Sequence, residues 1–151
     1  MTKREYTIVE EKYLAEFIAK EFPRATKVMY QVPCSDKPWK LAAKRKDVTP
    51  EWFYRFGPRI DAVVINDGTL WLIEAETRRP VNGLSELELY AANYKNSLLL
   101  RPYADLPLGV MLVSPILDEY VAAIMKAKGW VYKVYHPPWI TEHLRIWGII
   151  E

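Results

Sequence analysis

The sequence predicts an α/β fold in which a mixed central sheet is flanked by helices. Three observations support this. An amphipathic helical pattern opens the chain, two apolar runs joined by Asn-Asp-Gly-Thr follow it, and strand-like and helical segments then alternate. The expected order is helix, three strands, helix, strand, helix and strand, which contains an αβββαβ core. With 151 residues, 50% of them hydrophobic, the chain fits a single domain over residues 1–151.

Residues 5–22 predict the first helix, because their apolar side chains recur at helical spacing and Pro23 ends the pattern. Glu10 falls in the middle of the apolar arc of this helix, whereas Glu11 falls toward its flank. An inward-facing carboxylate is costly unless it is paired or bound to metal, which makes Glu10 a candidate site residue. The alternative is a half-buried glutamate that the helix dipole or water stabilises.

Residues 26–32 alternate as a strand and lead into a long insertion at about residues 33–58. The insertion carries basic residues at Lys40, Lys44, Arg45, Lys46 and Arg55, interleaved with Trp39, Trp52, Phe53, Tyr54 and Phe56. Basic and aromatic side chains together suit a phosphate backbone and its neighbouring bases. In the alternative interpretation the aromatic rings form a small satellite core and the basic groups are ordinary surface.

The next segment predicts a β-hairpin. Residues 60–65 and 70–73 are apolar runs, and they flank a turn that contains Asp67 and Gly68. Asp-Gly between two such runs is a strong hairpin signal. The start of the first strand and the end of the second strand are therefore expected to lie side by side.

Three carboxylates converge at that open end of the hairpin. Asp61 begins the first strand, and Glu74 and Glu76 end the second with their side chains on one face. Like charges this close raise each other's pKa unless a cation lies among them, and hard cations such as Mg²⁺ or Mn²⁺ prefer oxygen ligands. The alternative is a set of solvated acids in which Glu76 pairs with Arg78 or Arg79.

After the hairpin, Ser85 is expected to cap a helix that runs through about Leu100. Its core stripe comprises Leu84, Leu87, Ala91, Tyr94 and Leu98. A strand, a helix, a second strand and an amphipathic end of undefined type follow, at residues 108–113, 118–128, 130–135 and 140–150.

Composition limits the partners and the location that we expect. Lys and Arg number 21 against 19 Asp and Glu, so the overall charge neither requires nor excludes a nucleic acid. A single cysteine suits a reducing cytoplasm, and two histidines do not favour a zinc site. No apolar run approaches the roughly 20 residues that span a membrane. The abundance of Lys and Glu beside a single glutamine is typical of hyperthermophile proteins.

The order of the hairpin acids resembles the PD-(D/E)XK nuclease superfamily, which includes restriction endonucleases, archaeal Holliday-junction resolvases and RecB-like exonucleases. Asp61 matches the family's Asp, and Ile60 stands where Pro is common. Glu74 matches the second acid, and Glu76 stands where Lys is expected, as it does in some active restriction enzymes. The resemblance implies a restriction-endonuclease-like αβββαβ core.

Two further parts of the family pattern concern helices. The first helix often supplies an acid to the metal site, and similarity to the resolvases points to Glu11, whereas the facing of the helix points to Glu10. RecB-like members carry Gln-x-x-x-Tyr on the helix after the hairpin. Glu86 and Tyr90 occupy that spacing here, and Lys95 on the same helix is a candidate for the missing ammonium group.

The resemblance implies a metal-dependent nuclease that cleaves DNA. Asp61 and Glu74 would bind Mg²⁺ or Mn²⁺ with help from Glu10, and Glu76 would be a further ligand or the general base. The groups expected to hold DNA are Arg78 and Arg79 beside the acids, and Lys44, Arg45, Lys46 and Arg55 in the insertion. A homodimer is expected, because many of these enzymes bring two sites to two strands.

The main alternative is a catalytically inactive protein that keeps the nuclease fold and serves as a nucleic-acid-binding or protein-interaction module, with Glu76 marking the loss of the lysine. Glycoside hydrolysis by an acid pair is disfavoured, because Glu74 and Glu76 lie too close together on one strand to bracket a sugar bond.

Overall fold

The computed structural model describes residues 2–34 and 58–151 and confirms the predicted α/β fold. The strands are β1 Lys27–Pro33, β2 Arg59–Asn66, β3 Thr69–Ala75, β4 Leu108–Ser114 and β5 Val131–Val134. They form one five-stranded sheet in the order β1-β2-β3-β4-β5. Strands β1, β2 and β3 pair antiparallel, whereas β4 runs parallel to β3 and β5 parallel to β4, so the sheet is mixed as expected.

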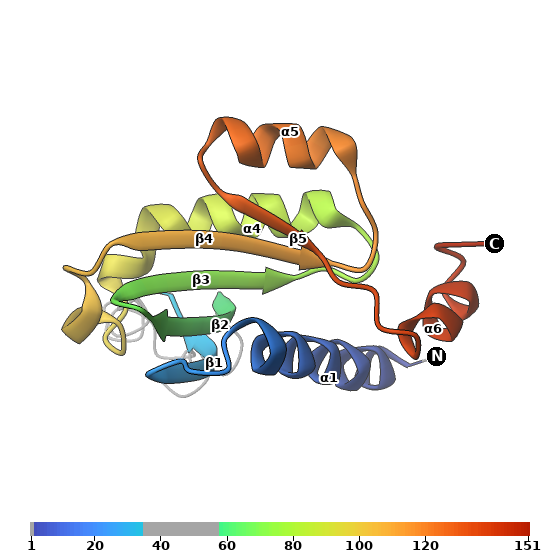
Figure 1. The fold of residues 1–151 in the computed structure, drawn as a ribbon, viewed down its shortest axis with the longest axis horizontal. Helices are drawn as coiled ribbons and strands as arrows, with labels where there is room; N and C mark the ends of the chain where they lie inside the picture. The colour runs from blue at the N-terminus through green and yellow to red at the C-terminus, as the bar shows by residue number, and fades with distance from the viewer. Residues whose placement is uncertain (1, 35–57) are drawn as a thin grey trace, which may run out of the picture.

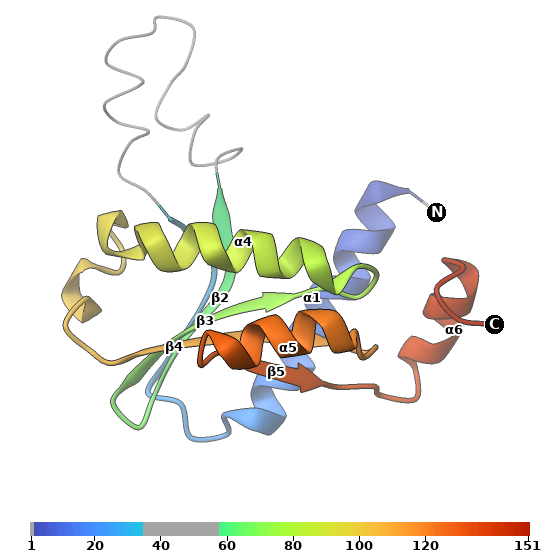
Figure 2. The ribbon, with the colours of Figure 1, turned by 90° about the horizontal axis from the view of Figure 1, so that it is seen from above.

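Helices cover both faces of this sheet. They are α1 Lys3–Glu21, α4 Pro80–Asn93, α5 Glu119–Ala127 and α6 Ile140–Ile146, with the short 3-10 helices η1 Tyr94–Asn96 and η2 Arg101–Tyr103. Figure 1 shows α4 and α5 on one face and α1 and α6 on the other. Figure 2 shows α4 and α5 lying along the sheet where each connects two parallel strands, which need such a crossover.

A separate hydrophobic core lies on each face of the sheet. The core beneath α4 and α5 includes Val63, Leu70, Leu72, Leu84, Leu87, Val110, Leu112, Val121 and Met125. The core beneath α1 and α6 includes Tyr13, Leu14, Phe17, Ile18, Val64, Ile73, Met111, Val113, Ile140 and Leu144. Alternate residues of β3 and β4 point into opposite cores, which is why both strands are almost continuously apolar.

The first helix begins at a capping box. The Thr2 hydroxyl accepts a hydrogen bond from the backbone N–H of Glu5 at 3.2 Å, and the Glu5 carboxylate accepts one from the Thr2 N–H at 2.6 Å. This cap places the start of α1 two residues before the predicted start at residue 5. The predicted apolar face is buried, so the first helix is confirmed.

The predicted hairpin is confirmed as β2 and β3. Asp67 and Gly68 form its two-residue turn with φ values of 49° and 73°. Positive φ at both positions matches the right-handed twist of the two strands. The turn fixes the register, so that Ala62 pairs with Ile73 near the open end.

The predicted boundaries of the second helix are wrong. Helix α4 starts at Pro80 rather than at Ser85, because proline fits the first helical position, where no N–H donor is needed. The Ser85 hydroxyl instead donates to the carbonyl of Val81 at 3.3 Å. The helix ends at Asn93, and Leu98 lies outside it with 40% of its surface exposed, so Leu98 is not part of the core stripe.

The chain end, left without a definite type by its sequence pattern, folds as helix α6. Ile140 and Leu144 anchor it in the core beneath α1. Figure 1 shows α6 beside the N-terminal half of α1, and the ring centroids of Tyr6 and Trp147 are 5.0 Å apart. Among the described residues, no helix combines the length and hydropathy needed to cross a membrane.

Close approach of α4 to the sheet depends on Gly83. A Cβ atom at this position would lie 2.4 Å from Leu112 Cδ1 and 2.8 Å from Glu76 Cγ. We expect Gly83→Ala to lower the free energy of unfolding by about 1–3 kcal/mol, even though alanine has the higher helix propensity. Urea unfolding measures the change. Ser85→Ala on the exposed side of α4 is the control, with an expected change within about 0.5 kcal/mol.

Candidate functional site

The open end of the hairpin is shaped by two carboxylates that take the place of backbone pairing. Beyond the pair of Ala62 and Ile73, the Glu74 carboxylate accepts a hydrogen bond from the Asp61 N–H at 2.9 Å. The Asp61 carboxylate in turn accepts one from the Ala75 N–H at 3.1 Å. The two acids are thereby held in fixed positions where the regular ladder of β2 and β3 stops.

Strand β1 contributes Gln31 to this end of the sheet. Its backbone has φ 52°, a left-handed conformation that costs a non-glycine residue on the order of 1–2 kcal/mol. The Gln31 side-chain amide donates to Asp61 Oδ1 at 3.4 Å. An unusual backbone conformation is thus found directly beside the candidate site.

Helix α1 supplies Glu10 to the same region. One oxygen of its carboxylate accepts hydrogen bonds from the Tyr6 hydroxyl at 2.6 Å and the Thr77 hydroxyl at 3.0 Å. The backbone N–H of Thr77 lies 3.4 Å from the same oxygen. Glu10 therefore ties the first helix to the residues that follow β3, whereas Glu11 is exposed.

Two more acids belong to this region, Glu76 after β3 and Glu86 on α4. Glu76 follows β3, is half-buried, and packs against Gly83 of α4. Glu86 lies on α4 and raises the pKa values of both Glu74 and Glu76. Glu86 therefore belongs to the acidic site. The sequence pattern indicates only its spacing from Tyr90 on the helix.

Burial is the main reason why the acids of this site hold protons tightly. It raises the pKa of Glu10 and of Asp61, although hydrogen bonds partly oppose the shift in each case. Burial and the nearby charge of Asp61 raise the pKa of Glu74, which is only 1% exposed. Burial and the charges of the neighbouring acids, Glu10 first, raise the pKa of Glu76 to about 8.

Among the described residues, positive side chains compensate these charges only weakly, since the charge of Arg78 lowers the pKa of Glu76 but is the smallest of the effects on it. In the described part of the chain, none of Glu10, Asp61, Glu74 and Glu76 forms an ion pair with a lysine or arginine. One buried carboxylate, Glu74, and three half-buried ones form an all-oxygen set, which is the kind of donor set that hard divalent cations prefer. The chemistry of these residues therefore fits Mg²⁺ or Mn²⁺.

The acids are not arranged as a finished metal cage. Within residues 2–34 and 58–151, no three His, Cys, Asp or Glu side chains are grouped so that they could hold one ion together. Instead, Asp61 and Glu74 each accept a hydrogen bond from a backbone N–H.

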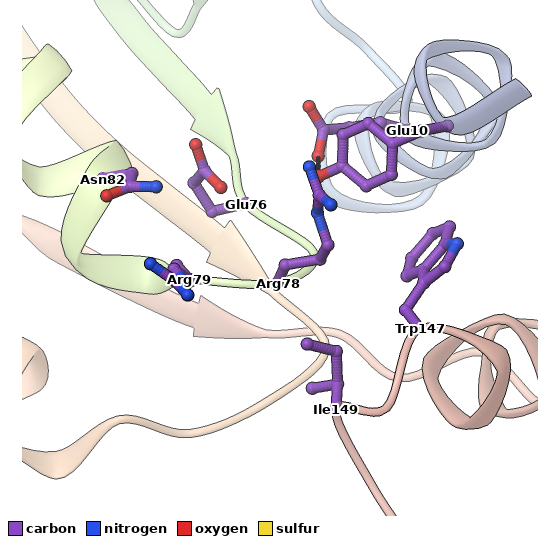
Figure 3. Close-up of a pocket in the computed structure, with 8 residues that line it drawn as sticks. Glu10, Glu76, Arg78, Arg79, Asn82, Trp147 and Ile149 are labelled. Atoms are coloured by element: carbon purple, nitrogen blue, oxygen red, sulfur yellow. Dashed lines mark hydrogen bonds between the residues drawn. The ribbon is translucent and has the colours of Figure 1, made fainter. Parts of the chain in front are cut away.

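A hollow of about 430 Å³ opens beside the acids, and we call it the Trp147 pocket. Its wall is formed by Tyr6, Glu10, Glu76, Arg78, Arg79, Asn82, Trp147 and Ile149. Figure 3 shows Glu76, Asn82 and Arg79 on one side of this space, with Trp147 on the opposite side. The Arg78 guanidinium lies over the Tyr6 ring at 3.9 Å from its centroid.

A second hollow of similar volume, about 430 Å³, also has Glu10 in its wall. We call it the Arg59 pocket, and Gln31, Arg59 and Asp61 contribute to its wall. Glu10 borders both pockets.

The structure brings Glu10, Asp61, Glu74 and Glu76 together, with Arg78 and Arg79 beside them. The basic residues predicted to hold DNA from the insertion, Lys44, Arg45, Lys46 and Arg55, lie outside the described residues. Lys95 is exposed on η1.

Sequence reasoning did not identify Tyr6, Gln31, Thr77 or Trp147 as parts of the site. Tyr6 is one of the apolar side chains at helical spacing within residues 5–22, and that spacing predicts its direction but not its hydrogen bond to Glu10. Thr77 is a polar side chain with 0% exposure, and only the folded chain reveals that. No local signal marked Gln31 or Trp147.

Comparison with known proteins supports the fold. No protein-family model and no curated protein sequence matches the chain. The structure is similar to the crystal structure of a repair endonuclease from Pyrococcus abyssi, with a TM-score of 0.53 and 18% sequence identity. The match covers 85% of this chain and 47% of the endonuclease, so this chain spans about half the length of that protein. At this identity the similarity shows a shared fold.

The raised pKa of Glu76 predicts a stability that falls as pH rises. An unfolded Glu76 titrates near 4.5, whereas the folded group titrates at about 8. Between these values the native state keeps a proton that the unfolded state has lost, so the free energy of unfolding decreases with increasing pH. In EDTA, wild type should lose more stability than Glu76→Gln between about pH 5 and about pH 8.5 in urea unfolding.

The control for this comparison is Glu142→Gln, which alters a carboxylate with a side chain 71% exposed. Its stability should follow the wild-type pH dependence. Parallel curves for wild type and Glu76→Gln would contradict the assigned burial of Glu76.

Proposed function

We propose that this chain is a metal-dependent nuclease of the PD-(D/E)XK type that cleaves phosphodiester bonds in DNA. The observation that carries the proposal is the adjacency of Asp61 and Glu74 at one end of the central hairpin, with Glu10 near enough for the charge of Asp61 to raise its pKa. These acids lack a cationic partner among the described residues, and they lie in a fold similar to that of a repair endonuclease.

In this proposal Asp61, Glu74 and Glu10 hold Mg²⁺ or Mn²⁺. When bound, the cation supplies positive charge that stabilises the charge developing on a phosphate and lowers the pKa of water. The Tyr6 and Thr77 hydroxyls orient the Glu10 carboxylate by donating to one of its oxygens. The Ala75 N–H orients the Asp61 carboxylate in the same way.

Glu76 occupies the position at which the family usually has lysine, and we assign it the role of general base or further ligand. It is half-buried and forms part of the wall of the Trp147 pocket. A carboxylate there can accept a proton from the attacking water, which lysine can do only in its neutral form. Arg78 and Arg79, exposed on the same pocket, can hold the phosphate group.

Two observations favour a second function, that of a nucleic-acid-binding module without catalysis. Within the described ranges no three potential ligands are already grouped around a common position, and the usual lysine is absent at Glu76. Such a module would bind nucleic acid without metal, and its affinity would not depend on Asp61 or Glu74.

The decisive experiment combines calorimetric titration of Mg²⁺ and Mn²⁺ with cleavage of plasmid and branched DNA. Wild type should bind metal and cut only in its presence. Asp61→Asn should lose metal binding and reduce cleavage by more than about 100-fold, since even changes to groups that only orient metal ligands cost 10–100-fold. The same experiment on Glu10→Gln and Glu11→Gln tests which acid of α1 takes part, and we expect only Glu10→Gln to weaken binding.

Glu119→Gln is the matched control, because this glutamate is exposed at the start of α5. It should bind metal and cut DNA as wild type does. Absence of metal binding and cutting in wild type, with unchanged nucleic-acid affinity in Asp61→Asn, would exclude the nuclease and favour the binding module.

Arg79 is expected to contact a phosphate. Arg79→Ala should weaken DNA binding at every sequence and reduce the magnitude of the slope of log affinity against log salt by about 0.7–0.9. Fluorescence anisotropy over a salt series measures the slope. Lys126→Ala, an exposed lysine on α5, should leave the slope unchanged.

A further inference from the structure

The Trp147 pocket contains groups that complement both parts of a nucleotide. Arg78, Arg79 and the exposed Asn82 provide donors that suit a phosphate or the edge of a base. Tyr6 and Trp147 contribute aromatic side chains to the lining of the same pocket. Glu10 and Glu76 border the pocket, so a nucleotide bound in it would adjoin the phosphate that the acids address.

The aromatic part of this pocket is held in place before any ligand binds. Trp147 packs edge-to-face on Tyr6, with ring centroids 5.0 Å apart and planes inclined by 63°. Trp147 also contacts the ring of His143 on α6, with centroids 5.7 Å apart. Tyr6 is fixed in turn by the Arg78 guanidinium and by its hydrogen bond to Glu10. A ring supported in this way loses little freedom when a base stacks on it.

The two pockets beside the acids, the Trp147 pocket and the Arg59 pocket, differ in the side chains that line them. The Trp147 pocket offers aromatic rings. The described residues that line the Arg59 pocket, which include no aromatic ring, are Thr7, Glu10, Glu11, Leu14, Gln31, Arg59 and Asp61. Arg59 Nε is buried there and has no hydrogen-bond partner among the described residues. The Trp147 pocket therefore suits the face of a base, and the described residues of the Arg59 pocket suit the backbone or the edge of a nucleic acid.

We propose that the Trp147 pocket binds an unpaired base adjacent to the phosphate that is cut, so that the substrate is a DNA strand with unpaired nucleotides on that side. This inference rests on the proposed function. In a duplex both faces of each internal base are covered by neighbouring bases, so aromatic side chains reach those faces only where the strand is single or splayed. Base stacking on aromatic side chains does not require a particular sequence.

Binding of three labelled probes tests the inference without metal and without cleavage. The probes are an eight-nucleotide oligo-dT, an abasic strand with the same number of phosphates, and a duplex of the same length. Fluorescence anisotropy in EDTA at one salt concentration gives the affinities. Wild type should bind oligo-dT about 5- to 150-fold more tightly than the abasic strand, the range that corresponds to stacking of one base.

Protein variants assign the difference to the pocket. Trp147→Leu should lower the affinity for oligo-dT and leave that for the abasic strand unchanged, and Trp147→Phe should restore most of the loss. Tyr120→Leu removes an aromatic ring that is 75% exposed on α5, and it should change neither affinity. Thermal unfolding shows which variants are folded, and the three probes on wild type test the proposal even if Trp147→Leu does not fold.

Equal binding of oligo-dT and the abasic strand by wild type would overturn the inference, as would tighter binding of the duplex than of oligo-dT. Failure of this inference differs from failure of the proposed function. Metal-dependent cutting without discrimination between the two single strands would exclude only the base pocket. Discrimination without cutting would exclude only the nuclease.

Discussion

The structure depends on the way in which β2 and β3 stop pairing. Where the next ladder bonds would lie, Glu74 accepts from the Asp61 N–H and Asp61 accepts from the Ala75 N–H. The backbone thereby holds one buried carboxyl group, Glu74, beside one that is half-buried, Asp61. Burying carboxylates without a counter-charge is unfavourable, and amide or hydroxyl donors offset only part of that cost. The hydrogen bonds of Gln31 to Asp61 and of Tyr6 to Glu10 are examples of such partial compensation.

Local rules predicted the central part of this arrangement. The Asp-Gly turn determines the register of the hairpin, and strand periodicity then determines which side chains share a face, so the proximity of Asp61 and Glu74 could be derived from the sequence. The inward direction of Glu10 followed from helical periodicity in the same way. The start of α4 was predicted wrongly because Ser85 and Pro80 both offer a starting signal, and tertiary packing through Gly83 selects the earlier one.

The other parts of the site involve contacts between distant segments, which sequence periodicity does not encode. Thr77 meets Tyr6 and Glu10 only because α1 crosses the end of β3. Trp147 reaches the same place from the end of the chain through the packing of α6 on α1. The left-handed backbone of Gln31 has no sequence signal either, since glutamine has no particular preference for that conformation.

The hydrogen bonds of the acidic site also differ in the number of residues that separate the two partners along the chain. The bond between Ala75 and Asp61 spans 14 residues within one hairpin, whereas the bonds between Thr77 and Glu10 span 67. Closing the longer loop costs more entropy, and hairpins form on a microsecond timescale. We therefore expect the contact between Asp61 and Glu74 to form earlier in folding than the contacts that join α1 to the end of β3. The burial of these acids is therefore expected to be completed only when the first helix docks, which is the step that closes the longer loop.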